Sequence, residues 1–557
     1  MAEAPIPAAS KKKGKKKGSV GAKDDTGDAA VFGGRLDIEV DCAKGRLLKA
    51  RSNFRAGDLI LREKPVAFIF RGTSAGIPTP SQPLPPHALD LSAIAGRHSC
   101  SEELLRMVLE LHTWLLSNAN DSDCLYRLEQ CQGPEPYLYA TAKGLLSLEC
   151  HLEQQPPDWR AAVQAATREM AAVLELDPAS SLTLLSLAAA VNVNSYGILS
   201  PGGSSLGFCL LPCVGLLINH SCDPNCHYTF SEGVMAFRAL RTILPGEEVT
   251  VSYIDTVVGT AARRATLLHT KHFLCRCNRC NAYDGAMQHV LEGRPMDLFD
   301  DDLLVELTVS TTKSKKAPAA PSSLAKAKSS INNSLLLADA YLDGLFCSVC
   351  GSSGVVLEHQ TAEACAFAGC LLCGKKVDYS EAVLAKLRAT ATGNDIMAMA
   401  KKSASLEVLT MLQTWLLQVD PSFSQLANDL KVKPAKNGAS QKGSNQRQKS
   451  MQLHPCHMLL IDAYTSLASI LLHHGDSRGG AACIRRSLRT MDAVLSPHHP
   501  ELVSLRLELA SVLRVQAQGG GAGASREADE LQAKCAASRS ILYGPEHPLV
   551  EELAAKR

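Results

Sequence analysis

The sequence predicts an α+β protein that is assembled from several units. Short strand-like runs broken by turns occur near the start of the chain and again in its middle, and helical periodicity fills both the stretch between them and the C-terminal region. Cysteine pairs between these regions indicate small units held by metal. At 557 residues, the chain is long enough for about three or four domains.

The composition is typical of a folded protein without membrane segments. The chain has 46% hydrophobic and 20% charged residues and a formal net charge of +2. No apolar run approaches the roughly 20 residues that span a bilayer, and no apolar signal segment opens the sequence. We therefore expect an intracellular protein, in the nucleus, the cytoplasm or both, with no membrane contact.

A basic segment opens the chain. Seven lysines lie in the first 23 residues, among Ala, Gly and Pro. Residues 1–33 are expected to be disordered, because they carry too little apolar surface to offset the entropy of ordering. The lysines either form a nuclear-localisation signal or are simply part of a solvated tail. The remaining chain is slightly acidic, so no direct nucleic-acid surface is expected.

A β domain interrupted by a helical insertion is predicted next. Residues 34–70 contain short apolar runs and turns, and residues 71–185 show helical periodicity after a Pro-rich stretch. Strand-like apolar runs return from Ala188 and are broken by Pro and Gly pairs. Residues 186–256 are therefore assigned to the second part of the β domain.

The second half of the chain divides into smaller units. Residues 257–285 form a cysteine-containing segment, and residues 340–380 form a second cysteine unit. Spans rich in Lys, Ser, Ala and Gly at 312–333 and 431–450 are predicted linkers. Residues 400–557 are predicted to be helical throughout apart from that second linker.

The C-terminal region contains an internal repeat. His-Pro pairs begin at His454, His499 and His547, about 45 to 48 residues apart, and each precedes an apolar segment. Because proline suits the first helical turn, each pair is expected to mark a helix start. Helix pairs similar to tetratricopeptide repeats are predicted, which form surfaces for protein partners.

Three motifs follow one another in the middle of the chain. NHSCDPNC runs from Asn219 to Cys226, GEEVTVSYID from Gly246 to Asp255, and C-x-C-x-x-C begins at Cys275. In this order they resemble the SET domain of protein-lysine methyltransferases, and more closely its SMYD branch. The resemblance implies a SET-type β fold with a pseudoknot, S-adenosylmethionine as cofactor, and a protein or peptide lysine as substrate.

The resemblance also assigns roles by position. The cofactor-binding residues it implies are Gly45, Arg46, Asn194, Asn219, His220, Tyr253 and Phe273. Taken singly, several have a structural alternative: Asn194 as a turn residue, His220 and Phe273 as core side chains. Their joint occurrence in the family order favours the cofactor site.

Tyr253 is the predicted catalytic residue. Methyl transfer needs a neutral amine, and free lysine has a pKa of about 10.4, so the site must help to remove a proton. An apolar channel disfavours the ammonium form, and a phenol can orient the amine. The alternative is a tyrosine that only packs within its strand.

Two zinc sites are expected. The triplet Cys275, Cys277 and Cys280 lacks the fourth ligand that tetrahedral zinc requires, and the family resemblance supplies it as Cys222. The spacing of Cys347, Cys350, Cys370 and Cys373 alone predicts a zinc ribbon. The alternatives are unlinked buried thiols at the first site and a redox pair at the second.

The sequence also departs from the family pattern. The insertion offers only scattered cysteines, so no MYND finger is expected. Leu47 stands where the family has the second glycine of its cofactor loop, and Lys271 replaces a tyrosine. Lys271 either borders the lysine channel or extends outward into solvent. These departures support a second hypothesis, an inactive SET-fold zinc scaffold that binds partners through its helical repeats.

Overall fold

The computed structural model describes residues 35–42, 44–71, 89–117, 145–146, 148–211, 214–293, 339–350, 355–360, 366–430, 452–518 and 522–555. The predicted tail at 1–33 and the predicted linkers at 312–333 and 431–450 lie outside these residues. Within the described part of the chain, no helix combines the length and apolar character needed to cross a membrane.

Small sheets build the β domain. They comprise β1 (Leu36–Asp41), β2 (Gly45–Ala50), β3 (Leu59–Glu63), β4 (Ala67–Phe70), β5 (Tyr196–Leu199), β6 (Ser205–Leu210), β7 (Asn219–His220), β8 (Cys226–Ser231), β9 (Val234–Ala239) and β10 (Thr250–Val251). The antiparallel orders are β1-β2, β3-β9-β8 and β4-β6-β5, and β7 pairs with β10 in parallel. Strands from both sides of the insertion therefore share sheets.

The parallel pair brings the two central motifs together. Asn219 pairs with Thr250 and His220 with Val251. The Ser221 amide then donates to the Val251 carbonyl at 2.9 Å. Because the pairing residues come from the NHSCDPNC and GEEVTVSYID motifs, this short ladder sets the position of Tyr253 relative to Asn219.

The insertion is helical, with α1 (Leu91–His98), α2 (Glu102–Ser117), α4 (Pro157–Val173) and α5 (Pro178–Asn194). Helix α5 continues to Asn194, so residues 188–194 are helical where the sequence predicted returning strands. Its buried residues include Leu184 and Val191 on one face and Leu185, Ala189 and Ala190 on others. A helix that is apolar on several faces lacks the polar stripe by which periodicity identifies helices.

The cysteine-containing segments follow. Helices α6 (Thr260–Lys271) and α7 (Asn278–Glu292) flank the triplet of cysteines. A four-stranded antiparallel sheet then contains β11 (Leu345–Phe346), β12 (Val355–Gln360), β13 (Ala366–Cys370) and β14 (Lys376–Val377) in chain order. Helix α7 packs on this sheet through Met287 and Val290, which share a core cluster with Val355 and Leu357.

The C-terminal region is a stack of helices. It contains α10 (Tyr379–Lys402), α11 (Leu406–Val419), α12 (Phe423–Asp429), α13 (Met458–His473), α14 (Ser477–Val494), α15 (Pro500–Gln518), α16 (Ala522–Tyr543) and α17 (Pro548–Ala555). Pro500 and Pro548 begin their helices as expected, whereas α13 begins at Met458 and not at the first His-Pro pair. There the His457 ring accepts from the Leu459 amide and caps the helix.

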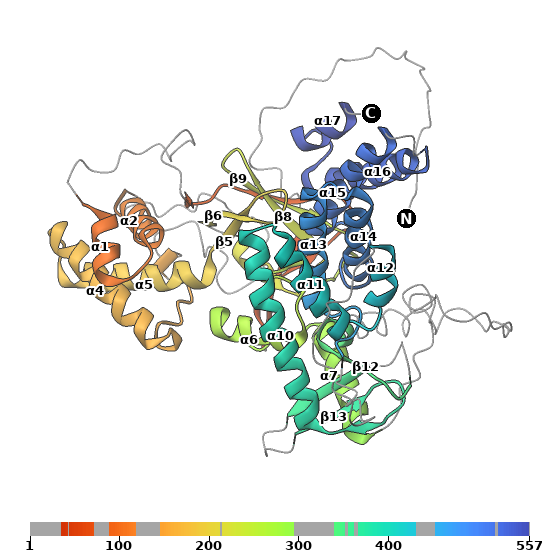
Figure 1. Ribbon diagram of the computed structural model, residues 1–557. Helices are drawn as coiled ribbons and strands as arrows, with labels where there is room; N and C mark the ends of the chain where they lie inside the picture. The colour runs from red at the N-terminus through yellow and green to blue at the C-terminus, as the bar shows by residue number, and fades with distance from the viewer. Residues whose placement is uncertain are drawn as a thin grey trace, which may run out of the picture.

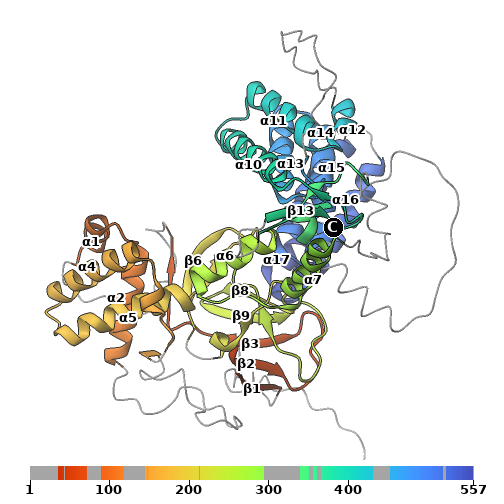
Figure 2. The same cartoon turned by 90° about the horizontal axis from the view of Figure 1, so that it is seen from below.

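The helical insertion and the C-terminal helices lie on opposite sides of the β domain (Figures 1 and 2). One core cluster joins the insertion to the strands, and another fills the C-terminal helices. The C-terminal stack also contacts the β domain, since Leu240 packs with Val503 and Leu542. The strands are thus covered from two sides, which leaves the candidate site between the insertion, the parallel pair and α6.

Candidate active site

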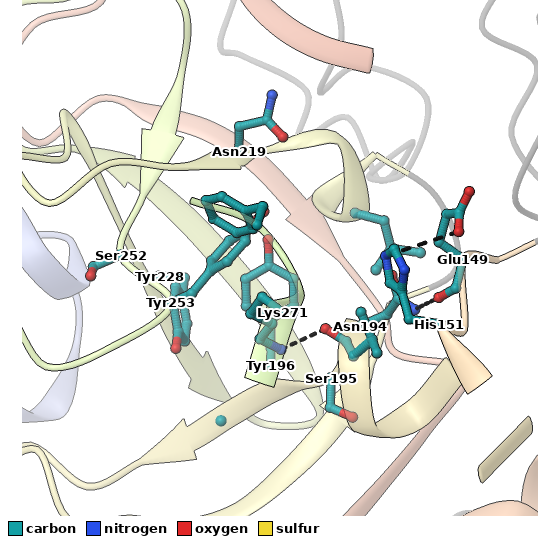
Figure 3. Close-up of a pocket in the computed structure, with 14 residues that line it drawn as sticks. Glu149, His151, Asn194, Ser195, Tyr196, Asn219, Tyr228, Ser252, Tyr253 and Lys271 are labelled. Carbon is teal, nitrogen blue, oxygen red and sulfur yellow. Dashed lines mark hydrogen bonds and ion pairs between the residues drawn. The ribbon is translucent and has the colours of Figure 1, made fainter. Parts of the chain in front are cut away.

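A cavity of about 230 Å³ lies where the insertion, the central strands and α6 meet. Figure 3 shows its walls as sticks. The lining residues are Glu149, His151, Val193, Asn194, Ser195, Tyr196, Gly197, Leu216, Asn219, Tyr228, Ser252, Tyr253, Lys271 and Phe273. Four residues of the predicted site, Asn194, Asn219, Tyr253 and Phe273, are therefore brought to one cavity.

Asn219 and His220 extend from β7 and connect three parts of the domain. The Asn219 amide nitrogen donates to the Arg46 carbonyl at 3.1 Å and to Glu248 Oε1 at 3.0 Å. The Tyr253 amide donates to His220 Nδ1 at 3.0 Å. His220 does not line the cavity; it supports Tyr253 from behind, and burial lowers its pKa to about 4.

Tyr253 is held with its hydroxyl inside the domain. The hydroxyl donates to the Ile218 carbonyl at 2.6 Å, and the ring lies 5.4 Å from the His220 ring. Burial raises the pKa of Tyr253 well above its ordinary value, with a further contribution from the charge of Glu248. The side chain is therefore a neutral phenol at physiological pH, and its proton forms a hydrogen bond with the Ile218 carbonyl.

The remaining predicted cofactor residues divide into two groups. Asn194 ends α5 and donates to the Glu149 and Ala190 carbonyls, while Phe273 borders the cavity near His220. Gly45 and Arg46 start β2 and are not among the cavity walls. Arg46 is joined to the cavity through its carbonyl and Asn219.

The glycine at position 45 has a conformational explanation. Its φ is +73°, in the left-handed region that glycine adopts without steric cost.

Leu47 is 5% exposed and does not line the cavity. The leucine that departs from the family pattern is thus an interior residue of β2, where it faces away from solvent.

Lys271 is turned inward. It is the last residue of α6, and its ammonium donates to the Val193 carbonyl at 2.5 Å. The ammonium lies 5.8 Å from the centroid of the Tyr253 ring. Burial lowers the pKa of Lys271 to about 8. Of the two alternatives for Lys271, extension into solvent is wrong, since the side chain forms part of the cavity wall.

The first cysteine cluster lies beside the cavity. Ligand atoms of Cys222, Cys275, Cys277 and Cys280 all lie within 4.8 Å of one another. The sulfur of Cys222 is 3.9 Å from that of Cys275 and 3.6 Å from that of Cys280. Zinc–sulfur bonds of about 2.3 Å in a tetrahedron place sulfurs about 3.8 Å apart, so these four thiols fit zinc.

His220 links this cluster to Tyr253. Its Nε2 lies 3.3 Å from the sulfur of Cys222. Because Nδ1 accepts the Tyr253 amide proton, the neutral ring carries its own proton on Nε2 and donates it to the sulfur. Such a donor stabilises a thiolate and orients a metal ligand. One imidazole thereby connects Cys222 to the backbone of Tyr253, two residues beyond β10.

A buried charged triad, which motif reasoning missed, supports the cluster. Arg263 donates to both carboxylate oxygens of Asp339, at 2.7 and 2.6 Å. Arg279 donates to the same carboxylate at 3.0 and 2.8 Å and to the Cys222 carbonyl at 3.1 Å. Burial opposes ionisation of Asp339, yet the two guanidinium groups hold its pKa below the ordinary value. No spacing in the sequence points to Asp339, because its partners lie 76 and 60 positions away.

The second cysteine cluster belongs to the four-stranded sheet. Cys347, Cys350, Cys370 and Cys373 place their sulfurs within 4.8 Å of one another. The Cys347–Cys373 and Cys350–Cys370 sulfur distances are 3.9 and 3.6 Å, too long for disulfides and suited to a tetrahedral zinc. Four thiolates would leave no open position, so a metal here has a structural role.

Two further tyrosines complete the cavity wall. Tyr196 donates to the Gly215 carbonyl at 2.6 Å, and its ring meets that of Tyr228 edge-on at 5.0 Å. Neither was predicted as a site residue, although Tyr196 stands only two positions after Asn194 in the sequence. The cavity is accordingly lined by three phenols, whose rings give it apolar faces beside the polar side chains of its wall.

A family model of the SET domain matches residues 45–254, which include strands β2 to β10, the insertion and Tyr253. The chain therefore contains a SET domain of the kind that the central motifs predicted. This match identifies the class of domain that surrounds the cavity.

The similar curated proteins are SMYD-type methyltransferases. Histone-lysine N-methyltransferase SMYD3 of Mus musculus is 38% identical over 104 residues, 19% of this chain and 24% of the relative. N-lysine methyltransferase SMYD2 of Homo sapiens is 39% identical over 102 residues, 18% of this chain and 23% of the relative. N-lysine methyltransferase SMYD2-A of Danio rerio is 27% identical over 272 residues, 43% of this chain and 58% of the relative. The chain thus spans between about a quarter and just over half of the length of these relatives, and over that part it is SMYD-like.

We predict two zinc ions per chain, with separable roles. Cys277→Ser should lose one zinc and the cofactor site, because the first cluster lies beside the cavity. Cys370→Ser should lose the other zinc and lower the melting temperature while leaving cofactor binding in place. Elemental analysis of protein purified without chelator checks the count; one zinc or none in the unaltered protein would contradict the assignment.

We also predict that Asp339→Ala is strongly destabilising. It leaves two buried guanidinium groups without their carboxylate, a change that typically costs about 3–5 kcal/mol. Asp343→Ala is the control, since it breaks the more exposed pair with Lys386, whose side chains are 21% and 17% exposed. That control should cost about 1 kcal/mol or less. Urea unfolding measures both, and equal midpoints would refute a special role for Asp339.

Proposed function

We propose that the protein is an S-adenosylmethionine-dependent protein-lysine N-methyltransferase, acting on a histone or another protein. The observation that carries the proposal is the placement of Tyr253 and Asn219 in one cavity, beside a four-cysteine cluster and within a matched SET domain. The similarity to SMYD2 and SMYD3 over the same part of the chain supports it.

The cavity has the side chains that such a cofactor requires. Phe273 offers an aromatic face for the adenine, and the amides of Asn194 and Asn219 are polar groups at the wall. We assign cofactor contacts to these residues and, by the family pattern, to Gly45, Arg46 and His220. When bound, the cofactor supplies a methyl group on a sulfonium sulfur, which becomes the thioether of S-adenosylhomocysteine after transfer.

Tyr253 orients the acceptor amine in this proposal. Its hydroxyl proton is held by the Ile218 carbonyl, so the lone pairs of its oxygen remain as acceptors for an amine N–H. A fixed acceptor aligns the nitrogen with the methyl carbon, and alignment lowers the barrier of an in-line displacement. The nitrogen–carbon bond forms as the carbon–sulfur bond breaks.

The cavity walls help to keep the amine neutral. The ring of Tyr196 is buried and those of Tyr228 and Tyr253 are half-buried, and such apolar surroundings disfavour a charged ammonium. The positive charge on the cofactor acts in the same direction. The proton of the substrate lysine is therefore released to solvent before transfer.

A second cavity fits a protein substrate with basic side chains. It measures about 290 Å³ and lies between the end of the SET domain and the C-terminal helices. Asp255, two positions after Tyr253, lines it together with Asp462 and Glu501, while the one lysine among its lining residues, Lys386, is paired with Asp343 at 2.9 Å. Burial, with the charges of Asp255 and Asp462, raises the pKa of Glu501 to about 7, so a cationic side chain there would be favoured. We propose that the C-terminal helices contribute to partner binding and that the protein acts in the nucleus, the cytoplasm or both.

An inactive zinc scaffold is the alternative function. Lys271 in the cavity wall is the observation that favours it, because a second cation there opposes binding of a sulfonium. Isothermal titration calorimetry with S-adenosylmethionine discriminates the two functions. A methyltransferase binds the cofactor, whereas a scaffold gives no heat of binding.

We predict that Tyr253→Phe lowers kcat by about 10²- to 10³-fold and leaves cofactor affinity nearly unchanged, since it removes a contact made in the transition state. Tyr196→Phe is the matched control, because it also removes a phenol that donates to a backbone carbonyl at 2.6 Å. The control should lose far less activity. Methyl incorporation into a verified substrate, followed by mass spectrometry, measures both, and equal rates for Tyr253→Phe and the unaltered protein would remove Tyr253 from the mechanism.

A further inference from the structure

The cavity contains a cation that comes from the protein itself. Lys271 reaches into it from the end of α6, and Figure 3 shows its side chain beside Tyr253 and Asn194. Its ammonium is fixed by the Val193 carbonyl at 2.5 Å and lies 5.8 Å from the centroid of the Tyr253 ring. The charge is thus held within contact range of the proposed reaction centre.

This ammonium has a neutral partner, the Val193 carbonyl, and no counter-ion among the residues that the structure describes. Across the described residues it forms no ion pair, even though Glu149 lines the same cavity. Its lowered pKa, about 8, results from burial alone. At pH 7 most molecules therefore keep the ammonium protonated, and its charge acts on whatever enters the cavity.

We propose that Lys271 is a specificity-determining residue that makes the cavity favour the neutral product S-adenosylhomocysteine over the cationic S-adenosylmethionine. The inference rests on the proposed function and deepens it by assigning a determinant of ligand preference to the same site.

The physical basis is repulsion between like charges. The two ligands differ by one methyl group and by the positive charge on sulfur. Transfer to an amine held by Tyr253 requires that the sulfonium also lie close to Tyr253, and hence within several ångströms of the Lys271 ammonium. At about 6 Å and an effective dielectric constant of about 20 the repulsion alone exceeds a factor of ten. Because Lys271 has a pKa of about 8 and can release its proton, the weakening at pH 7 is limited to about tenfold. The thioether of the product experiences no such penalty.

Calorimetric titration of the full chain with each ligand tests the proposal. The variant is Lys271→Met, which keeps an unbranched stem and removes the charge. Lys271→Arg is the control that retains the charge. The measured quantity is the Kd for S-adenosylmethionine divided by the Kd for S-adenosylhomocysteine, and because both titrations use the same protein, a partly unfolded fraction does not alter the ratio.

The expected result is a ratio that falls severalfold, up to about tenfold, in Lys271→Met and does not fall in Lys271→Arg, whose guanidinium keeps its proton. An unchanged ratio in Lys271→Met, with both ligands still bound, overturns the inference and leaves the methyltransferase proposal intact. Failure of the unaltered protein to bind either ligand overturns the proposed function and the inference together.

Discussion

The rest of this structure depends on how the buried charges of the first cysteine cluster are compensated by the neighbouring arginine–aspartate triad. Four thiolates around one Zn²⁺ ion carry a net charge of about −2, and Arg263, Arg279 and Asp339 together contribute +1 directly beside them. The side chains of the two Arg–Asp pairs are 0 to 2% exposed, so no water replaces a missing partner. Because the triad joins α6 and α7 to the segment before β11, the cluster connects the end of the SET domain to the second cysteine unit.

The positions of several residues in the cavity wall depend on this cluster. His220 donates to the sulfur of Cys222 and accepts from the amide of Tyr253. The position of the cluster therefore fixes the backbone at Tyr253. Phe273 and Lys271 reach the cavity from α6 and the chain just after it, immediately before the cysteine triplet. The metal would therefore act on catalysis through position and not through direct contact with the reactants.

Local motifs predicted much of the site, and long-range packing supplied the rest. The spacing of Cys347, Cys350, Cys370 and Cys373 was sufficient to predict the second cluster. The family resemblance was needed to place Asn219 and Tyr253 and to add Cys222 to the cysteine triplet. Asp339 could not be predicted, since only the fold brings it to Arg263 and Arg279. Residues 188–194 were assigned to the returning strands because burial on several faces of α5 removes the helical pattern. The inward direction of Lys271 depends on the Val193 carbonyl at the end of the same helix, which no motif encodes.

The most direct test of this account follows cofactor binding while zinc is withdrawn. Protein is treated with graded amounts of a chelator, and released zinc and the bound fraction of S-adenosylhomocysteine are measured in the same samples. The account predicts that binding is lost in step with the zinc held by Cys222, Cys275, Cys277 and Cys280, with far-ultraviolet circular dichroism largely retained. Full cofactor affinity after that zinc has left would contradict the claim that the cluster positions the cavity.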